Sequence, residues 1–167
     1  MSVFCEECRD EVSYIVKKKQ MTGTIRGIQY HYIGKEAKCA NCGAYVDVEK
    51  ISKSNLKALY NVYRKENNII SLEKIRAIPK RYNIDKRPLS IVLGWEEHTF
   101  THYANGDIPT LQHSETLNRL FDDPAYYLSI LEKNKGRLMS GRLISRQTYE
   151  KSYKAALYPL LINIKIY

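Results

Sequence analysis

The sequence predicts an α+β protein, with a small β-rich N-terminal domain followed by an all-helical domain. Residues 9–38 alternate β-branched and aromatic residues with polar ones, which is typical of strands. From Ser52 onward, apolar residues recur at helical spacing, and polar residues or glycines separate the repeats. The chain has 167 residues, of which 44% are hydrophobic, so it can form one ordinary domain or two small ones.

The strands of the N-terminal domain are expected to be short. Glycines at 23, 27 and 34 divide residues 9–38 into two or three strands, and residues 45–48 have the pattern of a further one. We expect His31 to be a polar strand or surface residue. An apolar stripe then marks a linker helix over 51–68, which would separate a domain at 1–50 from the helical domain.

The helical domain, 69–135, is expected to contain short helices because N-cap residues, prolines and glycines divide it. The expected helices are 72–77 with a brief continuation past Pro79 to Tyr82, 85–93, 96–104, 114–121 with Ser114 as the cap, and 123–134 stopped at Gly136. The C-terminal tail, 136–167, should contain a helix over 145–157. Its last residues, 160–167, have the composition of a strand, a packing arm or a frayed end.

All four cysteines of the chain lie in two CxxC pairs, Cys5-Glu-Glu-Cys8 and Cys39-Ala-Asn-Cys42. A CxxC turn presents two sulfur atoms on one side of a loop, and two such turns supply the tetrahedral thiolate set that Zn²⁺ prefers. The residues between the pairs are sufficient for a hairpin that brings the turns together. We therefore expect one structural zinc ion bound by Cys5, Cys8, Cys39 and Cys42.

Other uses of these cysteines fit less well. A disulfide framework conflicts with the absence of an export signal, and a redox CxxC needs only one pair at the start of a helix. Four thiolates leave no open position for water, so a catalytic zinc ion is not expected. No Ser/His/Asp arrangement, phosphate loop or carboxylate pair stands out, and we expect no enzymatic activity.

The charge and the N-terminal residues bear on location and partners. The N-terminus lacks the apolar run of a signal peptide, and no stretch approaches the roughly 18 apolar residues of a membrane span, so we expect a cytoplasmic protein. The chain has 27 Lys and Arg against 18 Asp and Glu, a formal net charge of +9. This excess favours a polyanionic partner, although an ordinary solvated basic surface has the same composition.

Two short helices around a glycine turn predict a helix-turn-helix, whose second helix would enter the major groove of double-stranded DNA. The first helix is 85–93, the turn is Gly94-Trp95 and the second helix is 96–104. Phe100 and Tyr103 can face the core, which leaves the polar side chains of the second helix for DNA. The candidate DNA-binding residues are Glu97, His98, Thr101 and His102, with Lys80, Arg81, Lys86 and Arg87 as flanking phosphate contacts.

The order of these features resembles the MqsA-type antitoxin family over residues 1 to about 131. The resemblance rests on the two CxxC pairs, the linker, Leu93-Gly94-Trp95 and the segment Phe100-Thr-His-Tyr-Ala-Asn-Gly-Asp-Ile-Pro109. Members of this family have an N-terminal YgiT-type zinc finger and a C-terminal Xre/Cro-like helix-turn-helix. The tail after Lys135 lies outside the resemblance and is similar to phage-associated relatives that continue past the helix-turn-helix.

The resemblance implies a type II antitoxin that binds a cognate toxin and autoregulates its operon. The zinc domain would bind the toxin, and the helical domain would form a homodimer on a palindromic operator in the promoter. The base-contacting Asn and Arg of the family fall on His98 and His102, which implies a different operator sequence. The zinc ligands carry over unchanged.

Two other functions fit the same residues. A phage or mobile-element repressor would bind DNA without a toxin partner, and the gene next to this one would distinguish it from an antitoxin. A zinc-ribbon adaptor would use the helices only for protein contacts. The adaptor would lack the steep salt dependence that counterion release gives to DNA binding.

Overall fold

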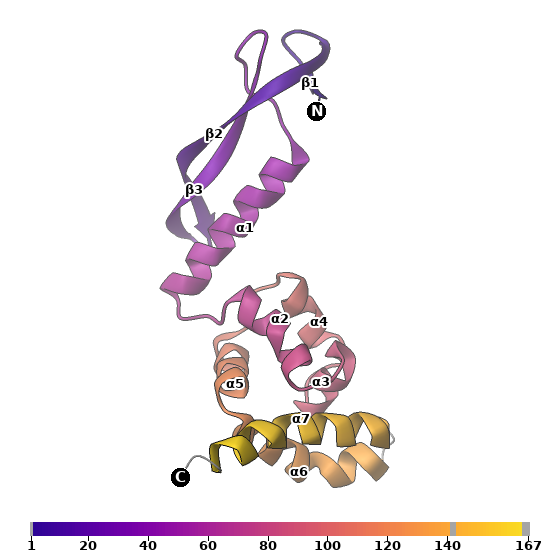
Figure 1. Cartoon of the computed structure of the whole chain (residues 1–167). Helices are drawn as coiled ribbons and strands as arrows, with labels where there is room; N and C mark the ends of the chain where they lie inside the picture. Colours follow the sequence, from indigo (N-terminus) through magenta and orange to yellow (C-terminus); the bar gives the residue numbers. More distant parts are fainter. Residues whose placement is uncertain (1, 141–142, 165–167) are drawn as a thin grey trace. The chain divides into compact units, whose positions relative to one another are not determined.

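The computed structural model describes residues 2–140 and 143–164. The chain divides into two compact units, Met1–Asn67 and Asn68–Tyr167. Within the described residues a three-stranded antiparallel sheet comes first and seven helices follow, which confirms the predicted α+β class (Figure 1). The predicted linker helix, 51–68, falls within the first unit except for its last residue.

The sheet of the first unit consists of β1 (Ser2–Cys5), β2 (Asp10–Ile25) and β3 (Ile28–Cys39), in that spatial order. A two-residue turn at Arg26 and Gly27, with φ values of 52° and 81°, joins β2 to β3. Positive φ at both positions is the type I′ geometry, which matches the twist of a hairpin. The prediction of short strands was wrong, because the hairpin pairs without interruption from Ile25 and Ile28 to Tyr14 and Cys39.

Two glycines that were expected to end strands lie inside them because a helix packs closely on the hairpin. Helix α1 (Glu49–Glu66) contacts β3 along its length. A Cβ at Gly23 would lie 2.5 Å from Cδ2 of Leu59, so only glycine permits this approach. At Lys35, the side chain of Asn55 pairs with both the backbone N–H and the backbone C=O, each at 2.8 Å.

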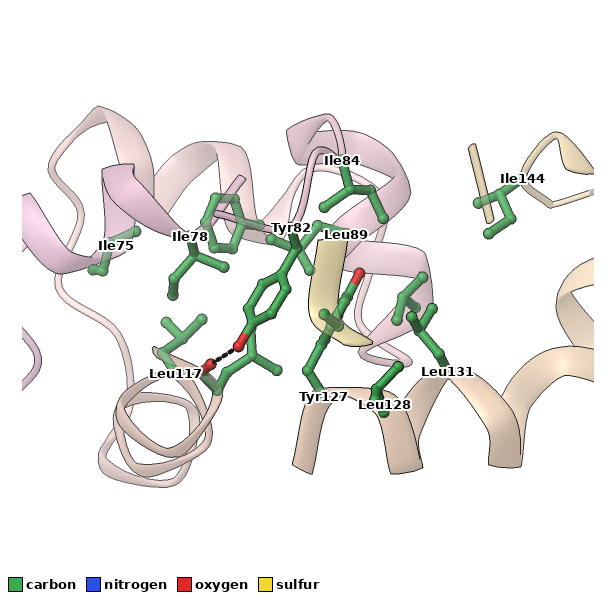
Figure 2. Close-up of a cluster of buried hydrophobic side chains, with 14 of the residues drawn as sticks. Ile75, Ile78, Tyr82, Ile84, Leu89, Leu117, Tyr127, Leu128, Leu131 and Ile144 are labelled. Carbon is green, nitrogen blue, oxygen red and sulfur yellow. Dashed lines mark hydrogen bonds between the residues drawn. The ribbon is translucent and has the colours of Figure 1, made fainter. Parts of the chain in front are cut away.

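The second unit contains six helices in its described part. They are α2 (Leu72–Arg81), α3 (Lys86–Val92), α4 (Thr99–Asn105), α5 (Leu111–Asp122), α6 (Pro124–Ser140) and α7 (Arg146–Ile164). Tyr82 and Tyr127 are fully buried in the hydrophobic core of these helices, and their rings stack with centroids 4.0 Å apart. The Tyr82 hydroxyl donates a hydrogen bond to the carbonyl oxygen of Leu120 at 2.6 Å, as Figure 2 shows.

Several helix boundaries differ from the predictions for physical reasons. Pro79 lies inside the single helix α2, which loses the one hydrogen bond that a backbone N–H at this position would donate to Ile75 and still continues to Arg81. Helix α5 begins at Leu111 because Thr110 is its N-cap, with its hydroxyl accepting the N–H of His113 at 3.2 Å. Ser114 is buried inside the helix and accepts the backbone N–H of Ile70 at 2.7 Å. Helix α6 continues through Gly136, since Leu138 beyond it is fully buried.

The described part of the tail is helical at 136–140 and 146–164. Helix α7 begins after Ser145, close to the predicted start, and continues to Ile164, so residues 160–164 form neither a strand nor an arm. Residues 165–167 lie outside the described residues. Helix α7 packs against α6, and the Ser152 hydroxyl lies 2.6 Å from that of Tyr127. Among the described helices, none combines the length and apolar character that a membrane crossing needs.

Candidate functional site

The two CxxC turns have the same backbone geometry. In the first turn the N–H of Arg9 donates to the carbonyl oxygen of Cys5 at 2.7 Å, and in the second the N–H of Gly43 donates to that of Cys39 at 3.0 Å. Arg9 and Gly43 both have positive φ, 53° and 76°. The first turn joins β1 to β2 and the second follows β3, so the sheet brings the two turns together.

The four sulfur atoms lie within 4.8 Å of one another. The Sγ atoms of Cys5 and Cys42 are 3.6 Å apart, and those of Cys8 and Cys39 are 3.8 Å apart. A zinc ion at the centre of a tetrahedron with Zn–S bonds of 2.3 Å requires sulfur atoms about 3.8 Å apart. All four cysteines are free thiols, so the set fits one metal ion such as Zn²⁺.

Backbone amides favour the ionised form of one ligand. The N–H groups of Cys42 and Asn41 point at Sγ of Cys39, at 3.4 and 3.3 Å, and the bond from Cys42 contributes most to lowering the pKa of this thiol to about 6. Hydrogen bonding, chiefly to Cys42, raises the pKa of Cys8 to about 12. A bound cation would reverse that effect, since it stabilises every thiolate directly.

Burial also fits a structural metal site. Cys5 and Cys39 are buried, and they form the centre of a small cluster with Val12. Four sulfur ligands would complete the coordination of zinc and leave no position for a substrate. His31 is an exposed strand residue that bonds to Thr22 at 3.2 Å, in agreement with its predicted role.

The predicted second helix of the DNA-binding pair begins later than expected. Helix α4 starts at Thr99, so Glu97 and His98 lie in the turn before it, and the helix prediction over 96–104 was wrong at its start. In this turn the Glu97 carboxylate forms an ion pair with the guanidinium of Arg87 on α3. Two of the candidate DNA-binding residues therefore pair with each other.

The face of α4 is divided as predicted. Phe100 is fully buried, and Tyr103 is half-buried against the same core. Thr101 is half-buried, whereas the His102 side chain is 66% exposed and lies 3.6 Å from the carboxylate of Asp107. His98, in the preceding turn, is 67% exposed. Of the four candidates in this segment, the two histidines are exposed, whereas Glu97 and Thr101 are half-buried.

The four flanking basic residues differ in their surroundings. Arg87 is paired with Glu97, and the guanidinium of Arg81 lies 5.4 Å from the ring centre of Phe121. Lys80 and Lys86 are exposed, and no carboxylate in the described parts of the chain lies within 4.0 Å of either ammonium group. These two lysines remain available to an external anion.

One buried hydrogen bond joins α3 to α4, and two further bonds join α3 to α6. The hydroxyl of Ser90, on α3, accepts the backbone N–H of Phe100 at 3.0 Å. At the C-terminal end of α3, Asn134 and Arg137 of α6 donate to the carbonyl oxygens of Val92 and Ile91, at 3.4 and 3.1 Å. The Ile91 carbonyl also accepts the backbone N–H of Gly94 at 3.0 Å, so side chains of α6 supplement the backbone bonds at this end of α3.

Among the grooves in the described residues, two have linings that suit a binding partner, and the sequence indicated neither. One is polar, belongs to the second unit and involves the tail; it is lined by Pro79, Lys80, Asn83, Ile84, Asp85, Thr148 and Lys151. The other is acidic and belongs to the first unit; it is lined by Val3, Phe4, Glu6, Glu7, Ala44, Tyr45, Val46 and Asp47. Residues distant in the sequence form each groove, and no local motif marks them.

The chain matches no known family model, and no curated protein matches it either.

Proposed function

We propose that the protein is a zinc-containing, DNA-binding transcriptional regulator that acts as the antitoxin of a type II toxin-antitoxin system. The observation that carries this proposal is the α3–α4 pair. One side of this pair is anchored in the core through Phe100 and Ser90, and the other exposes His98, His102 and Lys86. A helix-turn-helix presents polar and basic side chains to DNA in this way.

The turn between α3 and α4 supports the same proposal. Gly94 adopts a φ of 75°, which favours glycine, and it ends α3 before the chain enters the turn that precedes α4. The ion pair between Arg87 and Glu97 spans this turn and neutralises a carboxylate that would otherwise repel phosphate. In this proposal His102 reads base edges, Lys86 contacts phosphate and two chains bind a palindromic operator as a homodimer.

The acidic groove of the first unit supports a protein partner for the zinc domain. Its lining includes three carboxylates, from Glu6, Glu7 and Asp47, and two exposed aromatic residues, Phe4 and Tyr45. Carboxylates repel the DNA backbone, and exposed aromatic side chains are common at protein interfaces. This combination suits a cognate toxin with a basic surface. In this proposal the toxin is neutralised by stoichiometric binding, the protein catalyses no reaction, and it acts in the cytoplasm.

The test is a binding titration of the full chain with the duplex from upstream of its own gene and with a scrambled duplex. We expect His102→Ala to reduce the preference for the upstream duplex by roughly fivefold or more, because a base contact is lost. Lys86→Ala should weaken both duplexes by the same factor, because phosphate contacts carry no sequence information. The matched variant Lys133→Ala changes an exposed lysine on α6 and should bind as the wild type does.

Two results would overturn the proposal. The first is that the full chain binds neither duplex, or binds them with no dependence on salt, which would favour the protein-interaction adaptor. The second is the reverse pattern, in which Lys86→Ala alters sequence preference and His102→Ala weakens both duplexes equally. That pattern would mean that α4 is not the element that reads DNA.

A further inference from the structure

The polar groove of the second unit joins the tail to the region before α3. Its walls come from the end of α2, the loop between α2 and α3, and the first turns of α7. Lys80 lies on one wall and Lys151 on the other. The groove is thus formed by the predicted DNA-binding domain together with a helix that lies outside the family resemblance.

The charges in this groove are unbalanced. Lys80 and Lys151 are both exposed, and in the described ranges neither ammonium forms an ion pair. Asp85 is the only acidic residue in the lining, and its carboxylate makes no capping hydrogen bond to α3. Two cations facing one carboxylate leave a net positive charge, and Lys86, which is also unpaired, follows directly in the sequence.

The other lining groups suit an acceptor-only ligand. The side chain of Asn83 is exposed and has an amide N–H₂ donor, and Thr148 has a hydroxyl group. Only Pro79 and Ile84 are apolar. Phosphate oxygens take hydrogen bonds from Lys, Asn and Thr side chains at protein–DNA interfaces, whereas an apolar ligand would find little surface here.

We propose that α7 uses this groove to bind the phosphodiester backbone of duplex DNA, with Lys151 and Lys80 contacting the phosphate oxygens. The inference rests on the proposed DNA-binding function and assigns a role to the tail. The phosphate contacts of α7 would extend those of α3 beyond the helix-turn-helix. The tail would then add affinity for any duplex without adding sequence preference.

A neighbouring lysine on the same helix provides a matched control. Lys154, three residues after Lys151, lines a different groove between α6 and α7 together with Glu132 and Glu150. Lys135 also lines this groove, so its two lysines and two glutamates balance, and it lacks the positive excess of the groove that contains Lys151. Lys154→Gln removes the same charge from the same helix as Lys151→Gln does, so overall charge cannot explain a difference between the two variants.

The experiment measures the affinity of the full chain for duplexes of about 30 base pairs, roughly three helical turns, between about 50 and 200 mM salt. We expect Lys151→Gln to weaken the upstream and scrambled duplexes alike by roughly threefold to tenfold and to reduce the salt slope by about 1. Lys154→Gln should leave both quantities near the wild-type values. Circular dichroism checks that each variant is folded.

A second variant, expected to raise DNA affinity, strengthens the test. Asp85→Asn removes the one carboxylate of the groove and keeps a residue that caps helices well, so DNA affinity should rise. If the wild type binds DNA but Lys151→Gln has the same affinity as Lys154→Gln, the proposal that the tail binds DNA is refuted and the proposed function stands. If the wild type binds no duplex, both proposals fail.

Discussion

Gly43 and Arg9 occupy the same position in the two CxxC turns, directly after the second cysteine. Both have positive φ, which glycine adopts at no steric cost and other residues adopt with strain. The hydrogen bond that closes each turn comes from the N–H of this residue. The first CxxC turn therefore has a side chain at a position where the second has glycine.

We expect Gly43→Ala to weaken zinc binding. A Cβ at this position meets no atom within 4 Å, so the cost is that of the backbone alone, about 1 kcal/mol, or roughly a fivefold loss of affinity. Arg9→Ala is the matched control, because this position already has a Cβ and should bind zinc as the wild type does. Competition with a chromophoric chelator measures both, and equal affinities would refute the argument.

At the scale of elements, one side chain links α4 to α5. His113, in the first turn of α5, stacks on Trp95 with ring centres 4.1 Å apart, and its Nδ1 lies 2.8 Å from the hydroxyl of Tyr103. Burial raises the pKa of Tyr103, so the hydroxyl keeps its proton and can donate it to the neutral imidazole. Burial also lowers the pKa of His113.

The lowered pKa of His113 predicts acid sensitivity of this contact. As the pH falls, the His113 imidazole is protonated near pH 6.5 in the unfolded chain and only at a lower pH in the folded chain. The contribution of this contact to the free energy of unfolding is therefore complete above pH 6.5. This contribution is lost as the pH falls through the lower pKa that His113 has in the folded state. Thermal unfolding should show a smaller loss of Tm on acidification for His113→Gln than for the wild type. Trp95, the only tryptophan, reports the contact by fluorescence, and a pH-independent signal would contradict the prediction.

Element boundaries were the part of the fold that local patterns predicted least well. Glu97, expected within the second helix, precedes α4 and pairs with Arg87, and Ser114, expected to cap a helix, lies inside α5 and binds the backbone of Ile70. Each of these contacts joins residues ten or more positions apart. Capping rules allow both Thr110 and Ser114 as the cap, and the burial of Ser114 leaves Thr110, which accepts the His113 N–H at 3.2 Å.

At the scale of the whole molecule, the two units differ in what stabilises them. The buried cluster at the metal site consists of two ligand cysteines and Val12, with a few half-buried neighbours. The second unit has a core of many large apolar residues around Tyr82 and Tyr127 (Figure 2). Small domains with little apolar core usually need a metal or a disulfide to fold.

Removal of the metal should therefore act on one unit. We expect a strong chelator to disorder the CxxC turns and the adjoining ends of the sheet while α2–α7 keep their structure, and metal analysis should find about one zinc ion per chain. Amide NMR spectra of the isotope-labelled full chain report on the two units separately. Loss of dispersed signals from residues 68–164 on chelation would contradict separate stabilisation.

The pattern of residues alone was enough to predict the α+β class, the grouping of the four cysteines and the burial of Phe100, because each depends on residue type at short spacing. The long hairpin, the pairing of Arg87 with Glu97 and the groove between Lys80 and Lys151 depended on the tertiary structure. In these cases the partners come from different elements. Only the packing of helices and strands decides which distant charges meet and which remain available to a partner.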